Sequence, residues 1–344
     1  MKIYKILILL FSLPFTIFCN PIELKDELGR RVKVPEKVER VISLQPEITR
    51  IIVSLGCGEK LVGNDYFMSK FDHIFYNVFP FGKKLPLVSI SGSDLNLEFI
   101  IKLEPDIVFI SPTDSWMADK IEKYSNIPVL ALSSMGSFEK LKEEIKLISI
   151  LTKKTQRAEE LIFYFESKIR FIEERISKER KKPKVYLSFW SSFTKTPVYY
   201  EPVNLAGGIN VAEGLLPSYK GTVGTVVNLE KIIKWNPDII LIHGNYPPEE
   251  RAITVEKVLS DRRLSSIEAI RKRKVYYTFG FWFWWDPAEV LFETLYLSKI
   301  FHPSRFSQIN LVKEGREIFS KFYHSENAFE ILFKRLRCNE WKIE

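Results

Sequence analysis

The chain has 344 residues, which exceeds one typical domain and predicts two domains of roughly 120–150 residues. Its formal net charge is +8, from 51 basic and 43 acidic residues, and 14% of its residues are aromatic. The basic excess is spread along the chain, with its densest run at Lys178–Lys184, and no nucleic-acid-binding module accompanies it. The composition is that of a globular protein and argues against nucleic-acid binding.

The first nineteen residues have the pattern of a secretory signal peptide. Lys2 and Lys5 precede an apolar run, Ile6–Phe18, that is too short to span a bilayer as a stable anchor. Removal of residues 1–19 leaves a net charge of +6, and no later stretch approaches a transmembrane length. The mature protein is therefore expected outside the cytoplasm, in the periplasm or an equivalent compartment.

Three cysteines leave two questions open. Cys19 stands where a lipoprotein signal has its lipidated cysteine, but Phe18 replaces the small residue that usually precedes it. The sequence is compatible with a plain signal peptide and with a lipoprotein signal peptide. Cys57 and Cys338 are able to pair in an oxidising compartment, although Cys57 in SLGCGEKL is more simply a small core residue.

Strands and helices alternate in the first half of the chain. Asp26–Leu44 predicts a hairpin followed by a buried strand at Val41–Leu44, and Gly56 closes a helix over Ile48–Leu55. Further predicted elements are a strand at Lys60–Asn64, an aromatic-rich connection at Tyr66–Leu87, a polar turn at Ser89–Asp94 and a strand at Val129–Leu132. This alternation predicts parallel sheets with helices on both faces.

One fifteen-residue segment occurs twice, as NLEFIIKLEPDIVFI from Asn96 and as NLEKIIKWNPDIILI from Asn228, with ten identical positions. In each copy an asparagine caps a helix whose first turn carries a glutamate, Glu98 or Glu230. A proline then ends the helix, and a branched apolar run predicts a buried strand. Two copies about 130 residues apart indicate two similar α/β lobes.

A long helical stretch separates the copies. Phe138–Leu151 is amphipathic, and Thr155–Arg180 predicts a rod of about 40 Å that ends before Pro183. The second half predicts strands at Val185–Trp190 and Val275–Thr278, and a helix at Ala288–Phe301. Residues 302–344 predict further helix, whose apolar stripe contains Phe319, Phe322 and Tyr323.

Several motifs align in order with one family: DELGRRVKVPEKVERVISL, SLGCGEKLVG, the two repeats, NLAGGINVAEG, RKRKVYY and DPAEVLFETLYLSKIFHP. The chain thus resembles the substrate-binding proteins of cobalamin and ferric-siderophore ABC importers, the class with a single interlobe helix. The resemblance implies an α/β fold of two Rossmann-like lobes with mostly parallel sheets. The expected divisions are a signal at 1–19, an N-terminal lobe at 20–135, a helical linker at 136–182, a C-terminal lobe at 183–303 and a helical extension at 304–344.

The same resemblance implies a monomer that delivers a ligand to a permease dimer with its ATPase subunits. In that family an acidic residue of each lobe meets arginines of the permease, and the matching positions are Glu98 and Glu230. The alternative is that the two glutamates only stabilise their helices, because a negative charge is favourable at the positive end of a helix dipole.

The loops after the predicted strands are rich in aromatic residues. In doubly wound sheets ligands bind beyond the carboxyl ends of strands, and aromatic walls suit a bulky metal chelate such as a ferric siderophore, corrinoid or haem. No intrinsic cofactor is expected. The predicted ligand-binding residues are Gln45, Tyr66, Trp116, Trp190, Phe193, Tyr246, Trp282, Trp284 and Trp285, although part of the 282–285 cluster is equally readable as a core strand.

Three alternatives remain. The four histidines are not spaced as a metal site, although His243 ends a strand and is able to face the cleft. An oxyanion such as molybdate would need arginine or backbone amides, and the predicted cleft loops are short of arginine. A secreted two-lobed enzyme would depend on Asp65, Asp114 or Asp286, but the chain has no nucleophile elbow and no phosphate loop.

Overall fold

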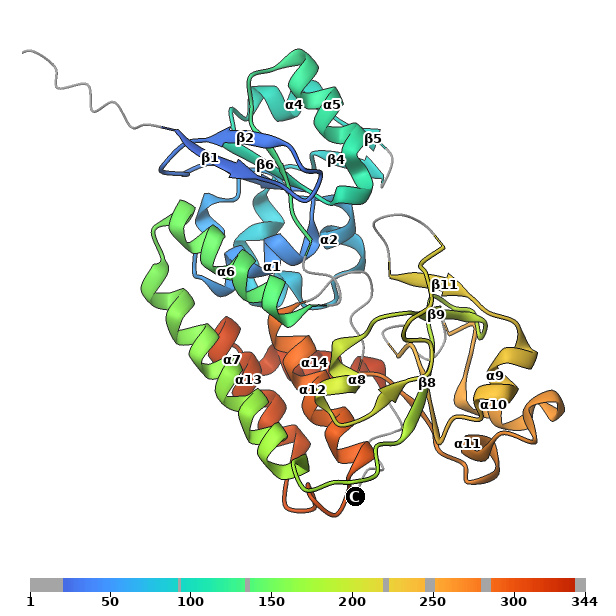
Figure 1. The fold of residues 1–344 in the computed structure, drawn as a ribbon. Helices are drawn as coiled ribbons and strands as arrows, with labels where there is room; N and C mark the ends of the chain where they lie inside the picture. Colours follow the sequence, from blue (N-terminus) through green and yellow to red (C-terminus); the bar gives the residue numbers. More distant parts are fainter. Residues whose placement is uncertain are drawn as a thin grey trace, which may run out of the picture.

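The computed structural model describes residues 21–91, 94–133, 137–218, 223–244, 251–279 and 286–337. Figure 1 shows two α/β lobes, with a pair of long helices running along one side of the molecule. This architecture confirms the predicted fold class. The predicted signal peptide, Cys19 and Cys338 lie outside the described residues.

The N-terminal lobe is built on a short parallel sheet in the order β3-β6-β7. All residues of β3 (Val41–Ser43), β6 (Ile107–Ile110) and β7 (Val129–Ala131) are buried, because helices cover both faces of a parallel sheet. The predicted hairpin is also present, as antiparallel strands β1 (Ile22–Lys25) and β2 (Arg31–Val34).

The connection between β3 and β6 differs from its prediction. Lys60–Asn64 forms no strand, because only Leu61 and Asn64 make single bridges to neighbouring segments. The aromatic connection and the polar turn that follow contain regular structure of their own. These elements are α2 (Tyr66–Phe71), α3 (Phe75–Val78), the 3-10 turn η2 (Pro80–Lys84), β4 (Ser89–Ser91) and β5 (Asp94–Leu95).

The remaining helices of this lobe follow the strand ends. Helix α1 begins at Pro46, one residue after Gln45, and Gly56 with its φ of 72° ends the segment as predicted. Cys57, next to it, is fully buried in the core, in keeping with the simpler of its two readings. The elements are α1 (Pro46–Ser54), η1 (Gly58–Lys60), α4 (Leu97–Lys102), η3 (Pro112–Asp114) and α5 (Ser115–Tyr124).

Two helices, α6 (Phe138–Thr152) and α7 (Thr155–Ile176), link the lobes. Lys153 between them takes a left-handed conformation, with a φ of 59°. At 1.5 Å per residue, α7 measures about 33 Å, shorter than the predicted rod because the helix ends at Ile176. Helix α6 contacts α1, whereas α7 contacts α8 and α12. None of the helices in the described ranges is long and apolar enough to cross a membrane.

The C-terminal lobe has a four-stranded parallel sheet in the order β10-β8-β12-β13. A two-stranded antiparallel ribbon lies beside it and faces the N-terminal lobe in Figure 1. The strands are β8 (Lys184–Ser188), β10 (Ile209–Asn210), β12 (Ile239–Ile242) and β13 (Val275–Tyr277), with β9 (Lys195–Pro197) and β11 (Gly224–Val226) in the ribbon. The helices are α8 (Glu201–Leu205), α9 (Leu229–Trp235), α10 (Val255–Ser260), η5 (Arg262–Leu264) and α11 (Glu268–Arg271).

The C-terminal helices α12 (Pro287–Phe301), α13 (Leu311–Tyr323) and α14 (Glu326–Leu336) form one packed unit. The predicted stripe of α13 is buried, and α13 packs on α12 as expected. The unit also reaches the other lobe, because α13 contacts α1 and α14 contacts α3. Arg157 of α7 adds a hydrogen bond of 2.6 Å to the carbonyl of Lys321. The extension therefore bridges the two lobes.

The two copies of the repeat perform the same local task. Asn96 and Asn228 accept hydrogen bonds from the third residue beyond them and so cap α4 and α9. The aspartate of each Pro-Asp pair then holds the backbone that begins the adjacent strand: Asp106 accepts from the amide of Arg40, and Asp238 from the amide of Lys184, both at 2.8 Å. Each copy thus fixes one helix start and one strand start.

A buried charge cluster joins the lobes. Arg50 of α1 is fully buried, and its Nε lies 2.7 Å from Asp72 and 3.4 Å from Asp286, whereas Nη2 lies 3.4 Å from Glu289. The Tyr323 hydroxyl donates to Asp286, and the guanidinium stands 5.1 Å from the centre of the tyrosine ring. Burial, together with Asp286 and Asp72, raises the pKa of Glu289 well above its ordinary value. Burial raises the pKa of Asp72 as well, so the cluster crowds its carboxyl groups around a single guanidinium.

Asp65 is the buried cap of α2. Its Oδ2 accepts from the amides of Phe67 and Met68, and its Oδ1 accepts from the Ser89 hydroxyl at 2.8 Å. Burial raises the pKa of Asp65 from 3.8 to about 6, against the opposing effect of the Ser89 hydroxyl and the backbone amides.

Replacing Arg50 by methionine should lower the free energy of unfolding by about 3–5 kcal/mol, because it leaves three buried carboxyl groups without their cation. Arg31→Met is the control, since the side chains of Arg31 and its partner Glu23 are 80% and 48% exposed, and it should cost less than about 1 kcal/mol. Urea unfolding of both variants measures the difference. Equal losses would show that the cluster contributes no more than a surface pair.

Asp65 predicts a pH dependence of stability. Because its pKa is raised on folding, the folded state holds this proton more tightly, so its contribution is present below the unfolded pKa and is lost as pH rises to about 6. The unfolding free energy of the native protein minus that of Asp65→Asn should fall by about 3 kcal/mol between roughly pH 4 and pH 7. Urea titrations across this range test it, and a difference that grows with pH would contradict the assignment.

Candidate ligand-binding cleft

The candidate ligand-binding residues are sought in the segments that follow the carboxyl ends of the parallel strands. In the N-terminal lobe the first residues after β3, β6 and β7 are Leu44, Ser111 and Leu132, and Gln45 follows Leu44. In the C-terminal lobe the first residues after β8 and β12 are Phe189 and His243. Ligands of doubly wound sheets bind beyond these ends, so the two edges define the candidate cleft.

A concavity lies at the carboxyl edge of the C-terminal sheet. Its polar lining is Ser188, Ser191, His243 and Arg251, and Ile242 and Ile253 add apolar walls. His243 follows β12 directly, and its ring stacks on Phe189 with centroids 4.6 Å apart. The sequence had suggested that His243 is able to face the cleft; the structure shows it buried in the lining of this concavity.

Arg251 is the residue of this concavity that sequence reasoning missed. Its guanidinium is 4.0 Å from the centre of the Tyr277 ring and donates to the carbonyls of Gly244, at 3.2 Å, and Leu336. Only 8% of the residue is exposed. The available signal was that Arg251 precedes the Thr254 cap of α10 and so belongs to the loop that follows β12.

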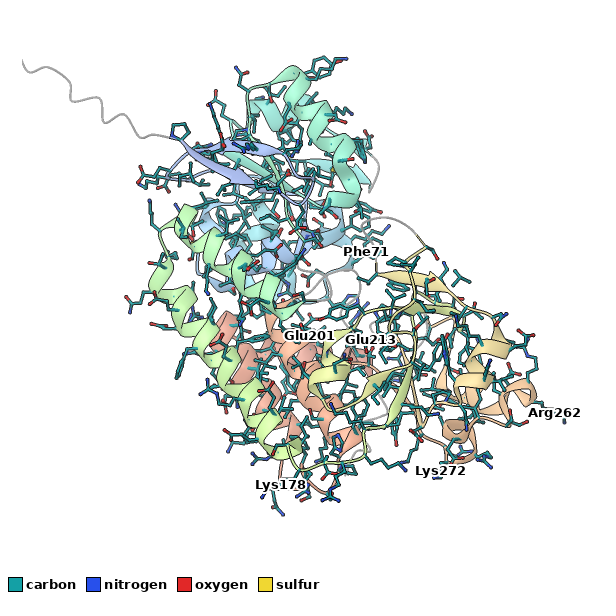
Figure 2. All side chains as sticks on the ribbon, in the orientation of Figure 1. Phe71, Lys178, Glu201, Glu213, Arg262 and Lys272 are labelled. Atoms are coloured by element: carbon teal, nitrogen blue, oxygen red, sulfur yellow. The ribbon has the colours of Figure 1, made fainter. Side chains whose placement is uncertain are left out.

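The N-terminal wall contains a group of aromatic rings on α2. Tyr66, Phe67 and Phe71 contact one another with centroids 5.8–6.0 Å apart. Lys70 donates to the Tyr66 hydroxyl at 2.8 Å and lies over the rings of Tyr66 and Phe71. Figure 2 labels Phe71 on the edge of this lobe that faces the other lobe. Of these residues, the sequence had selected Tyr66 alone.

The other predicted ligand-binding residues divide into four groups. Gln45 is buried, and its amide reaches the Leu132 carbonyl at 3.5 Å. Trp116 is 37% exposed at the start of α5. Trp190 and Phe193 are half-buried in the C-terminal lobe and contact Phe189 and Tyr186 respectively. Tyr246, Trp282, Trp284 and Trp285 lie outside the described residues.

The two candidate docking carboxylates occupy equivalent positions. Glu98 and Glu230 are exposed in the first turns of α4 and α9. Because these helices run antiparallel to the strands that follow them, their amino ends lie on the carboxyl side of each sheet. Within the described ranges, no basic side chain forms an ion pair with either residue.

The aspartates considered for catalysis have structural partners. Asp65 caps α2, and Asp286 caps α12 and contacts Arg50. Asp114 accepts from the Thr113 hydroxyl at 3.4 Å, and burial raises its pKa. In the part of the chain that the structure describes, no group of three histidine, cysteine or acidic residues is arranged to hold a metal ion.

The chain is similar to known binding proteins. Residues 41–279 match the family model described as periplasmic binding protein. The molybdate-binding protein MolA of Haemophilus influenzae is 26% identical over 94% of this chain and 97% of its own. An uncharacterised ABC-transporter substrate-binding lipoprotein of Bacillus subtilis, YvrC, is also 26% identical, over 74% of this chain and 77% of its own.

Solved structures share the fold over most of the chain. MolA bound to molybdate superposes with a TM-score of 0.71 at 23% identity, covering 88% of this chain and 98% of that one. The CeuE protein of Helicobacter pylori, in a nickel–histidine complex, gives 0.68 at 20% identity, covering 90% and 97%. Both solved proteins hold a ligand, molybdate in the first and a nickel–histidine complex in the second. The chain therefore belongs to the periplasmic binding protein family, as a substrate-binding protein of the ABC-transporter type.

Proposed function

We propose that this protein captures a small metal oxyanion of the molybdate class and delivers it to an ABC importer. The observation that carries this proposal is the concavity at the carboxyl edge of the C-terminal sheet, where Arg251 and His243 are brought together with Ser188 and Ser191. Guanidinium, imidazole and hydroxyl groups all donate hydrogen bonds to oxyanions. The chemistry of the lining therefore fits an anion.

Burial strengthens this attraction. The guanidinium of Arg251 is buried, and a charge removed from water interacts more strongly than an exposed one. The Tyr277 ring beneath the guanidinium and the carbonyls of Gly244 and Leu336 fix its orientation. A fixed cation needs little reorganisation when an anion enters.

The size of the concavity also favours a small ligand. Even with the space open to solvent counted, it has about 200 Å³, below the roughly 300–1,000 Å³ typical of pockets for larger organic ligands. The similarity to MolA, a molybdate-binding protein, supports the same ligand class.

A metal chelate is the second candidate, and the aromatic group on α2 favours it. Tyr66, Phe67 and Phe71 offer rigid ring surface, and Lys70 adds a positive charge beside them. A ferric siderophore or corrinoid would use these rings rather than the concavity around Arg251.

The carboxylates Glu98 and Glu230 are proposed to dock the two lobes on the two permease subunits. Their shared position in both repeats, their exposure and the helix starts that hold them support this role. Two matched negative charges suit a pseudo-symmetric receptor with basic contacts.

The identity of the ligand is tested by measuring the affinity of the purified protein for oxyanions and by replacing Arg251. Molybdate and tungstate should bind the purified protein in calorimetric titrations, and Arg251→Gln should weaken binding by about 10- to 100-fold, as expected for loss of a charged hydrogen bond. Arg263→Gln, an exposed arginine at the outer end of the same lobe, is the control and should bind normally. Arg251→Lys, which keeps the charge, should fall between the two.

Metal analysis of the protein purified from its native host separates the two candidates. Molybdenum or tungsten is expected. Iron or cobalt, combined with loss of binding in Tyr66→Ala and unchanged binding in Arg251→Gln, would overturn the oxyanion in favour of a chelate.

Docking is tested by charge reversal. Glu98→Lys with Glu230→Lys should reduce ligand uptake at least tenfold while ligand affinity is unchanged, because each new lysine would face basic permease residues. Glu159→Lys with Glu256→Lys reverses two exposed glutamates on α7 and α10 and should leave uptake normal. Normal uptake in the first double variant would show that docking depends on other residues.

A further inference from the structure

The basic excess of the chain, spread out in the sequence, is gathered at one end of the fold. The segment 178–184 has five basic residues and one acidic residue, and the segment 261–274 has six and two. Together they have a net charge of +8, so the rest of the chain beyond residue 19 has a net charge of −2. We name these two segments the basic pole.

Sheet topology brings the segments together. Lys184 begins β8 and Lys274 directly precedes β13, and β12 lies between these two parallel strands. The amide of Asp238 donates to the Lys184 carbonyl at 2.8 Å, and the amide of Ile240 donates to the Lys274 carbonyl at 3.0 Å. Both segments therefore meet at the amino edge of the sheet, opposite the edge that carries the ligand concavity.

The positive side chains point outward. All eleven basic residues of the pole are exposed, and Figure 2 shows Lys178, Lys272 and Arg262 along the end of the C-terminal lobe away from the other lobe. Its three acidic residues are less exposed and are already engaged: Glu179 pairs with Arg305, Asp261 with Arg263, and Glu268 with Arg271 and Lys272. The exposed Glu173 and Glu174 on the last turn of α7 mark the boundary of the pole.

We propose that the basic pole is a contact surface for an anionic phospholipid bilayer. Charges distributed over several elements fit an extended negative surface better than a small ligand. The two segments contain no aromatic residue, so they lack the stacking platforms with which proteins bind single-stranded nucleic acid. A bilayer requires only charge, with about 1 kcal/mol gained per basic residue near the surface.

Vesicle binding tests the proposal on protein that begins at residue 20 and has no lipid anchor. It should co-sediment with phosphatidylglycerol vesicles at low salt, not with phosphatidylcholine vesicles, and should be released at about 1 M salt, where the Debye length is roughly 3 Å. The variant with Lys181, Lys182, Arg262 and Lys274 replaced by glutamine should lose at least tenfold in its partition coefficient, as expected for four surface charges.

A matched variant separates the pole from net charge. Replacing Lys25, Lys33, Lys123 and Lys146, which are exposed on the N-terminal lobe and linker, by glutamine removes the same four charges and should change binding less than about threefold. Thermal unfolding confirms that both variants fold. Equal losses in the two variants, no binding to phosphatidylglycerol vesicles, or binding to DNA alone would each overturn the proposal.

Discussion

The structure depends on the ion cluster around Arg50. This guanidinium comes from the N-terminal lobe, but Asp286, Glu289 and Tyr323 come from the helices that close the C-terminal half. A buried ion pair contributes little net stability, yet removing one partner destabilises the fold strongly. Such a cluster is therefore stable only in the geometry in which every charge keeps its partner. Only the arrangement of lobes that brings α1 against α12 and α13 satisfies these groups. The lobes are therefore fixed by chemistry at their junction as well as by the linker helices.

A fixed junction determines how the cleft can recognise its ligand. If the lobes moved far apart, the carboxyl groups of the cluster would be exposed to different surroundings and the contacts of α13 with α1 would break. The proposed recognition then uses groups that are already in place, namely Arg251 on its tyrosine ring and His243 on Phe189. A preformed site of this kind suits a small rigid anion, because little entropy remains to be lost on binding.

The sequence allowed most of the local structure to be predicted, because it is encoded locally. The repeat predicted its caps, helices and strands correctly, since each depends on residues within fifteen positions. Lys60–Asn64 was wrongly predicted as a strand, because its pairing depends on distant neighbours. The Arg50 cluster joins residues 239 positions apart, and no periodicity reveals it. Arg251 was missed for a related reason, because its place in the site is set by the ends of β8 and β12. The basic pole was not predicted, because its two segments are distant in the sequence and only the strand order of the sheet brings them together.

The parallel sheet of the C-terminal lobe thus separates two tasks by strand direction. Parallel strands place all their carboxyl ends at one edge and all their amino ends at the other. In this lobe the carboxyl edge has the concavity with Arg251 and His243, whereas the amino edge has the exposed basic pole. Positive charge occurs at both edges, but it is buried and oriented at the first and solvated at the second. Burial makes the first suited to one small anion at short range, and exposure makes the second sensitive to extended surfaces and to salt. Basic residues at the two edges of this four-stranded sheet are therefore suited to different ligands, because strand direction decides which edge each residue reaches.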